Sequence, residues 1–157
     1  FMYVGLLALT MARHFLGAPV EGKMTPTLWV HLAPLSVIPL SMLALLKTTG
    51  DASLLRYGSL VAAAFLGAAL WWLVLAVSMT IRNRRQGKLP FALSWWAFVF
   101  PIGACSVLAY RVSELLALEV LPLVASELTL LALFVWSATA LGTVRGIRTG
   151  AIFAPAH

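Results

Sequence analysis

Residues 57–81 read YGSLVAAAFLGAALWWLVLAVSMTI and contain no Asp, Glu, Lys or Arg. The hydrocarbon core of a bilayer is about 30 Å thick, and a helix needs roughly 20 predominantly apolar residues to cross it. The stretch is therefore long enough and apolar enough to be a transmembrane helix. A soluble helix of this length would need a polar face, and this stretch has none.

Three further stretches have the same character, at residues 27–46, 91–110 and 120–144. The last of these contains one acidic residue, Glu127. Residues 1–12 are also apolar but too short to span a bilayer, and we interpret them as the end of a helix that begins upstream. The sequence therefore predicts an all-α polytopic membrane protein with one transmembrane domain over residues 1–157.

The composition of the whole chain agrees with this class. Of its 157 residues, 62% are hydrophobic and 10% are charged, and the mean hydropathy is +0.98. A soluble domain carries about 25% charged residues, so an ordinary cytosolic enzyme and a disordered tail are both excluded. The single cysteine, Cys105, cannot form an internal disulfide. The net charge of +6 does not indicate nucleic-acid binding, because the basic residues lie between apolar runs.

The basic residues instead predict the topology. Because successive spans alternate sides, the connectors at 13–27 and 82–90 share one face with the C-terminal tail, and those at 47–56 and 111–119 share the other. The first face carries Arg13, Lys23, Arg82, Arg84, Arg85, Lys88, Arg145 and Arg148, and the second carries Lys47, Arg56 and Arg111. Positive charge is retained inside, so we expect an integral protein of the plasma membrane, the inner membrane of a bacterium, with a cytoplasmic C-terminus.

No pattern in the chain indicates an enzyme, a metal centre or a bound cofactor. The sequence has no glycine-rich phosphate loop, no zinc-protease motif and no nucleophile elbow. Its histidines, His14, His31 and His157, are scattered over different segments. His31 lies about one turn inside its span, where it is either a pore-facing proton carrier or a histidine hydrogen-bonded near the interface, and the second interpretation is favoured.

The prolines separate the spans into two kinds. Pro34 and Pro39 interrupt the span at 27–46, and Pro101 interrupts the span at 91–110. Each removes a backbone hydrogen bond and bends its helix, and such breaks are tolerated where protein or a watery cavity satisfies the freed carbonyls. The sequence therefore favours helical hairpins, each with a kinked inner helix and a straighter outer one. The alternative is that membrane helices are simply richer in proline than soluble ones.

The span at 91–110 also contains two phenylalanines, Phe98 and Phe100, that cannot both face a central pore. At about 100° per residue, Phe98 and Phe100 point roughly 200° apart, so only one of them can face a central pore. An aromatic ring beside the bend at Pro101 can close a narrow hydrophobic constriction, which gates by excluding water. The alternative is a phenylalanine that only packs. Small residues in this span, Gly103 and Ser106 among them, permit close helix approach.

Two parts of the chain resemble one known family. Residues 89–91 read LPF and residues 94–101 read SWWAFVFP, which resembles the signature of the tellurite-resistance and C4-dicarboxylate transporter family. This family includes the slow anion channels of plant guard cells. Residues 26–34, PTLWVHLAP, are similar to its seventh helix.

The resemblance implies a fold and a function. The family has ten helices in five hairpins around a quasi-fivefold pore, with odd-numbered helices inside, and assembles as homotrimers. By this resemblance the chain comprises the end of helix six and helices seven to ten, and the gating phenylalanine before the proline of helix nine corresponds to Phe100. The transported species would be small anions, either C4-dicarboxylates such as malate and succinate or oxyanions such as tellurite. Helices one to five are missing, so the other half of the pore must come from another chain, or the sequence is a fragment.

Two points remain open from the sequence. Glu127 lies two turns beyond Glu119, where its charge either reaches water or pairs with Arg111, and a structural or subunit-interface role outweighs substrate binding. The main rival to a transporter is a non-transporting membrane subunit whose helices form a scaffold for a partner. A membrane-embedded enzyme is the weaker rival, because clustered polar side chains are missing.

Overall fold

The computed structural model describes residues 2–17, 25–89 and 91–150, and all of the regular structure in these ranges is helical. The connector at 18–24 and the tail from residue 151, with His157, lie outside the described residues. Four helical stretches are long and apolar enough to cross a membrane, which confirms the predicted class. The elements are α1 (Met2–Leu16), α2 (Thr25–Trp29), α3 (Leu32–Thr48), α4 (Ala52–Arg85), a 3₁₀ turn (Leu93–Trp95), α5 (Trp96–Leu116) and α6 (Leu121–Arg148).

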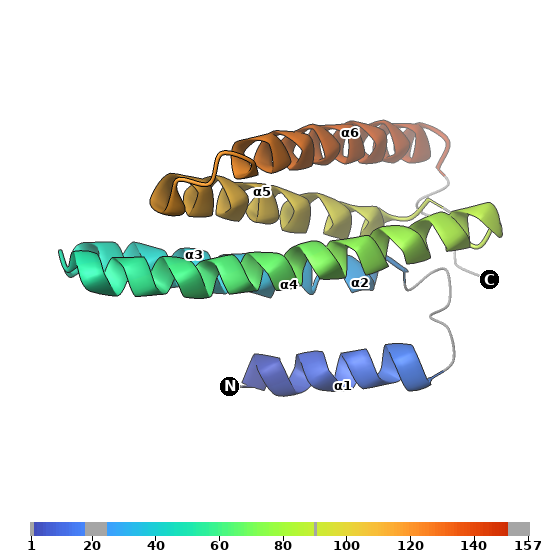
Figure 1. Cartoon of the computed structure of the whole chain (residues 1–157). Helices are drawn as coiled ribbons and strands as arrows, with labels where there is room; N and C mark the ends of the chain where they lie inside the picture. The colour runs from blue at the N-terminus through green and yellow to red at the C-terminus, as the bar shows by residue number, and fades with distance from the viewer. Residues whose placement is uncertain (1, 18–24, 90, 151–157) are drawn as a thin grey trace.

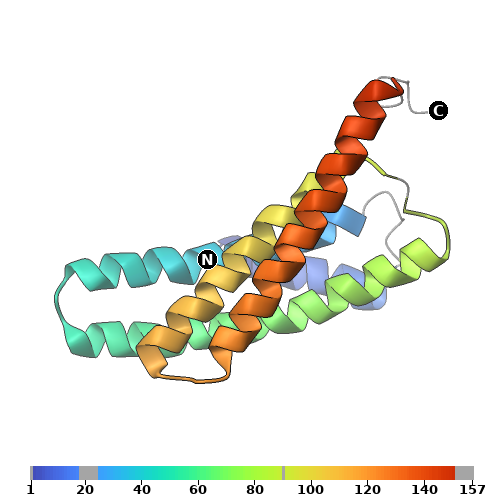
Figure 2. The same cartoon turned by 90° about the horizontal axis from the view of Figure 1, so that it is seen from above.

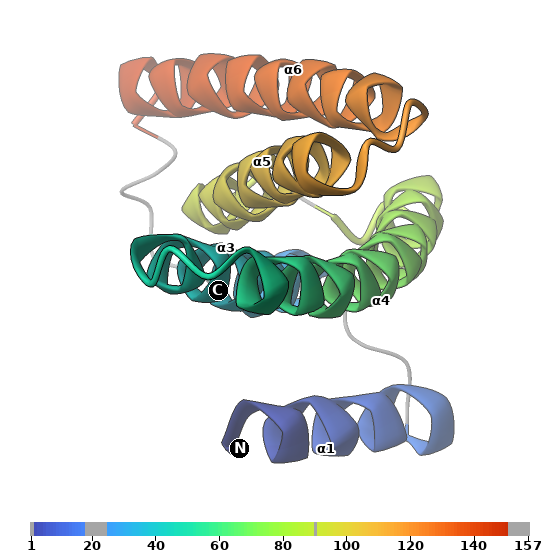
Figure 3. The ribbon, with the colours of Figure 1, turned by 60° about the vertical axis from the view of Figure 1, so that its left-hand side comes forward.

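The helices form two antiparallel hairpins. A short turn joins α3 to α4, another joins α5 to α6, and in each hairpin the two helices pack closely on each other. The α5–α6 hairpin crosses obliquely over the α3–α4 hairpin, with α5 next to it and α6 on the outside (Figures 1 and 2). Figure 3 shows the same layers from another side, with α1 and α5 on opposite sides of the α3–α4 hairpin. Helix α5 is therefore the central element, in contact with α3, α4 and α6.

Local sequence sets the ends of α4. The Asp51 carboxylate accepts hydrogen bonds from the backbone N–H groups of Ser53 (2.8 Å) and Leu54 (3.2 Å), which caps the first turn. Beyond Arg85 the chain turns through Gly87 at φ +67°, a conformation that glycine adopts without strain. The helix is about 50 Å long at 1.5 Å per residue and so extends past the bilayer core at its ends.

One stripe of α4 faces the rest of the protein. Its buried residues recur every three or four positions, as on one face of a helix. Ala62, Ala69 and Ala76 are among them and let neighbouring backbones approach, while Leu66 and the fully buried Trp72 fill the space between. The opposite side of α4 is exposed, as expected for an outer helix beside lipid.

Helix α6 packs along α5, and one polar contact joins the two helices. The Ser106 hydroxyl donates to the carbonyl of Ala125 (2.8 Å) and lies 2.7 Å from the hydroxyl of Thr129. Hydrogen bonds between helices are one of the forces that associate them in lipid, where apolar side chains gain little by leaving the solvent. Only Ala125, Leu128 and Thr139 are buried on α6, so most of this helix is exposed.

Gly142 of α6 lies close to the ring of Phe91, in the segment that leads into α5. A Cβ atom at Gly142 would collide with the ring of Phe91, whereas one at Gly67 on α4 meets nothing within 4 Å. We expect Gly142→Ala to destabilise the protein by about 1 kcal/mol or more through overpacking. Gly67→Ala, the matched control, should leave stability unchanged or raise it slightly. The apparent unfolding temperature in detergent measures both.

Introducing Gly142→Ala into a protein that already carries Phe91→Ala tests the cause of the expected loss of stability. Once the ring is removed, Gly142→Ala should no longer destabilise, because the added methyl group then has room. An equal loss with and without the Phe91 ring would contradict the assigned contact.

Candidate functional site

The candidate site is a helix interruption inside the first long span. Helix α2 ends at Trp29, and α3 starts at Leu32. The intervening turn is held by short-range bonds, from Val30 N–H to the Thr27 carbonyl (3.3 Å) and from Ala33 N–H to the Val30 carbonyl (3.1 Å). Pro34 has no N–H to donate to the Val30 carbonyl, and its ring crowds that carbonyl, which favours a break in the helix at this point. The sequence predicts a bend near Pro34, and the structure has a break one turn before it.

Two aromatic side chains from other helices bond the carbonyl groups at this break. The Trp72 indole N–H of α4 donates to the Leu28 carbonyl at 2.7 Å, in a buried contact. The Tyr3 hydroxyl of α1 donates to the His31 carbonyl at 2.9 Å. Within a bilayer, irregular backbone must find its partners inside the protein, because lipid supplies none. Trp72 and Tyr3 therefore stabilise the interruption.

Helix α2 is also fixed to the C-terminal half of α4 by side-chain hydrogen bonds. The Asn83 amide donates to the Thr25 hydroxyl at 2.6 Å, and both residues are buried. The Trp29 indole N–H donates to the Thr80 hydroxyl at 3.0 Å. These contacts orient the short helix, which has too few residues to be stable alone.

His31 lies at the break itself. Its ring packs edge-on against Trp72, with centroids 5.0 Å apart, and its centroid is 6.3 Å from that of Tyr3. The side chain is half-buried. The ring of His31 therefore lies among aromatic side chains at the break.

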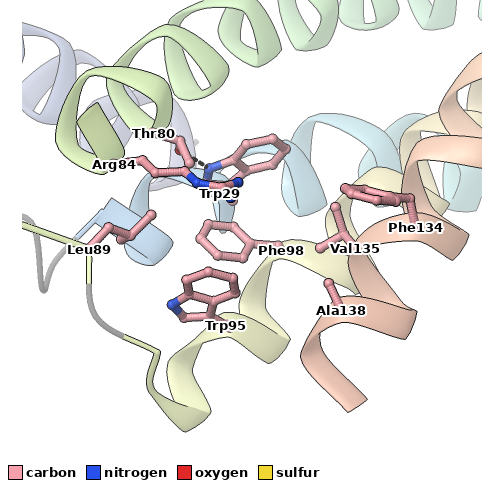
Figure 4. Close-up of a pocket in the computed structure, with 9 residues that line it drawn as sticks. All are labelled: Trp29, Thr80, Arg84, Leu89, Trp95, Phe98, Phe134, Val135 and Ala138. Carbon is pink, nitrogen blue, oxygen red and sulfur yellow. Dashed lines mark hydrogen bonds between the residues drawn. The ribbon is translucent and has the colours of Figure 1, made fainter. Parts of the chain in front are cut away.

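The two phenylalanines of α5 lie on opposite faces. Phe98 is 4% exposed and contacts Trp29 and Trp95 edge-on, at centroid distances of 5.2 and 5.8 Å (Figure 4). Phe100 is 64% exposed and points away from the packed face. Pro101, next to it, is buried. Pro101 thus lies on the packed face of α5, and the Phe100 ring lies on the open one.

The open face of α5 includes Phe100 and Val107, with the partly exposed Gly103 between them. A Cβ atom at Gly103 would meet nothing within 4 Å, so this glycine does not serve close helix packing within the described chain, unlike the expectation from sequence. Ser106, by contrast, does contact α6, as the fold shows. On α3, Pro39 is buried and Pro34 is half-buried, so the two prolines differ in their surroundings.

Glu127 is exposed on α6, and of the two alternatives left by the sequence, the pairing with Arg111 does not form. Arg111 instead donates to Glu114 Oε2 at 2.9 Å, one turn further along α5. Both side chains of that pair are about half exposed, so the pair contributes little to stability. Among the described residues, no group of three His, Cys, Asp or Glu side chains is arranged to hold a metal ion.

Sequence reasoning missed the polar role of Trp72. In the sequence, Trp72 lies in the middle of a charge-free span, far from either interface, where a tryptophan gives no direct sign of a polar role. The available signal was its indole N–H, which needs an acceptor when buried, together with a neighbouring span whose prolines free carbonyl groups. Tyr3 was missed for the same reason.

Together these features define an integral membrane protein with an interrupted helix and a central helix that contains a proline. Residues 1–144 match the model of the family described as voltage-dependent anion channel (SLAC1), and the chain belongs to this family. The match confirms the family indicated by the sequence resemblance.

Two curated relatives come from Methanocaldococcus jannaschii. The proteins named uncharacterized transporter MJ0576 and uncharacterized transporter MJ0762 are each 29% identical to the chain over 98% of its residues. The aligned region covers 44% of the first relative and 45% of the second, so the chain spans less than half of their length. No solved structure matches the chain.

Proposed function

We propose that the chain forms part of a membrane pathway for small anions, as a channel or a transporter. The observation that carries this proposal is the match to the anion-channel family over residues 1–144. The transporter names of the two relatives support it. A channel family fits a protein that is not an enzyme.

The proposed pathway runs along the open faces of α5 and of the interrupted α2–α3 segment. Helix α3 begins inside the span, and the N-terminal end of a helix carries partial positive charge, which favours an anion nearby. The basic residues at the end of α4 raise the anion concentration at the same side of the membrane. The substrates we propose are C4-dicarboxylates such as malate and succinate, or oxyanions such as tellurite.

Phe100 is the proposed gate, with Pro101, Pro34 and Pro39 shaping the two inner helices. Of these two phenylalanines, Phe98 is held in the packed face, so Phe100 is the one whose ring is available to close the pathway. In the assembled protein we propose a ten-helix pore per subunit and a trimer of subunits. The membrane is proposed to be the plasma membrane, with the C-terminus in the cytoplasm.

Anion flux into liposomes that contain the purified chain tests the proposal. Uptake of malate, chloride and tellurite is compared with uptake by empty liposomes at equal lipid concentration. We expect uptake above the empty-liposome level, with a preference among the three anions. A folded, correctly inserted protein without flux of any of them would contradict a pore formed by this chain alone. It would favour either the scaffold alternative or a pore that needs the missing helices.

A further inference from the structure

A second candidate site lies on the packed side of α5. A partly open cavity of about 250 Å³ lies between α2, α4, α5 and α6 (Figure 4). Trp29 of α2, Trp95 of the 3₁₀ turn and Phe98 of α5 contribute aromatic rings to its lining. The lining residues are Trp29, Thr80, Arg84, Leu89, Trp95, Phe98, Phe134, Val135 and Ala138.

This cavity is apolar apart from one end. The Thr80 hydroxyl already accepts the hydrogen bond from Trp29. Arg84 is the charged residue of the lining, and it lies in the last turn of α4. The basic residues Arg82, Arg85 and Lys88 lie close to it in the chain. The cavity therefore combines an aromatic interior with a positively charged rim.

No acidic side chain of the described chain lies near this rim in sequence or at this end of α4. Asp51 caps the opposite end of α4, and Glu114 and Glu119 lie around the turn between α5 and α6. Glu127 is in the first half of α6, whereas the cavity contacts the second half at Phe134 to Ala138. Among the described residues, no acidic side chain is therefore placed to neutralise Arg84.

The sides of the cavity belong to the two most exposed long helices. Of the α4 and α6 windows that are apolar enough to span a membrane, only 28% and 11% are buried. Phe134, at the cavity edge, is 69% exposed. The cavity therefore opens between the two long helices that have the most exposed surface.

We propose that the cavity binds an anionic phospholipid, with part of an acyl chain against Trp29, Trp95 and Phe98 and the phosphate at Arg84. An arginine guanidinium matches a phosphate with parallel N–H···O bonds, and basic pockets between transmembrane helices suit anionic headgroups. This site is separate from the proposed pore face, because Phe98 and Phe100 lie on opposite sides of α5. The bound lipid stabilises the packed face of α5, on which Phe98 lies.

Native mass spectrometry of the detergent-solubilised full chain tests the headgroup assignment. The protein is equilibrated with phosphatidylglycerol or phosphatidylcholine, and the retained lipid is counted. Wild type should retain phosphatidylglycerol preferentially, and Arg84→Gln should weaken that retention by roughly fivefold. Arg85→Gln, the matched control outside the cavity lining, should keep most of it. Equal retention of the two lipids by wild type, or equal effects of the two substitutions, would overturn the proposal.

A second pair of variants tests the acyl-chain assignment. Ala138→Phe fills the cavity and should displace the retained lipid, while Ser137→Phe places the same ring on the neighbouring exposed position and should not. Retention unchanged by Ala138→Phe would overturn the proposal. If that substitution instead alters the oligomeric state with lipid retention intact, the cavity is a contact for a second copy of the chain, and the lipid assignment fails.

Discussion

Replacement of Phe100 by alanine is expected to raise anion flux through the reconstituted protein by roughly tenfold or more. The ring is 64% exposed beside the buried Pro101, on the face of α5 that leaves the packed core. A bulky apolar ring in a narrow passage excludes water and so blocks ions, and its removal lets the passage hydrate. The measurement is the initial rate of malate or chloride uptake into liposomes at equal protein content.

Phe134→Ala provides the matched control for this prediction. Phe134 is a phenylalanine of similar exposure, 69%, but it lies on the outer helix α6. Its substitution should leave the flux at the wild-type rate. The gate assignment fails if Phe100→Ala and wild type conduct equally in a correctly inserted protein, or if both alanine variants raise the flux alike.

The opposite placement of Phe98 and Phe100 illustrates what periodicity can predict. The angle between successive side chains on a helix is a local property, so the separation of roughly 200° follows from the sequence alone. Which of the two rings would be buried did not follow. That outcome depends on Trp29 and Trp95, which come from other elements and contact Phe98 in the folded protein.

The ends of α4 show a different limit. The charge-free stretch begins at residue 57, but the helix begins at Ala52 because Asp51 caps it there. Hydropathy identifies the part of a helix that lies in lipid, whereas capping determines where the helix itself begins. Arg56 therefore lies inside the helix, although the sequence places it in a connector.

Arg111 shows why charge pairing was harder to predict than topology. The sequence offered Glu127 on another helix as a partner, and the structure uses Glu114, three residues away on the same helix. Residues three apart on a helix are neighbours without any tertiary rearrangement, so a local partner is easily reached. Glu127 is left exposed on α6, consistent with a position near water or another subunit.

Loss of Trp72 should be among the most destabilising substitutions in this protein. Trp72→Phe keeps an aromatic ring but removes the N–H that bonds the Leu28 carbonyl at 2.7 Å. A buried carbonyl left without its partner costs about 1–3 kcal/mol. Trp72→Ala also empties a site that is only 2% exposed, so its total cost should reach about 3–5 kcal/mol.

Apparent unfolding temperatures in detergent would rank these variants, with Trp136→Phe and Trp136→Ala as controls. Trp136 is 50% exposed on α6, so both of its substitutions should have small effects. Backbone hydrogen exchange would then locate the loss, because Trp72→Phe should speed exchange over residues 25–34 more than elsewhere. If Trp72→Phe is as stable as wild type, the Leu28 carbonyl has another partner in the membrane. In that event water at the break would be the best candidate, since lipid offers no donor within the bilayer core.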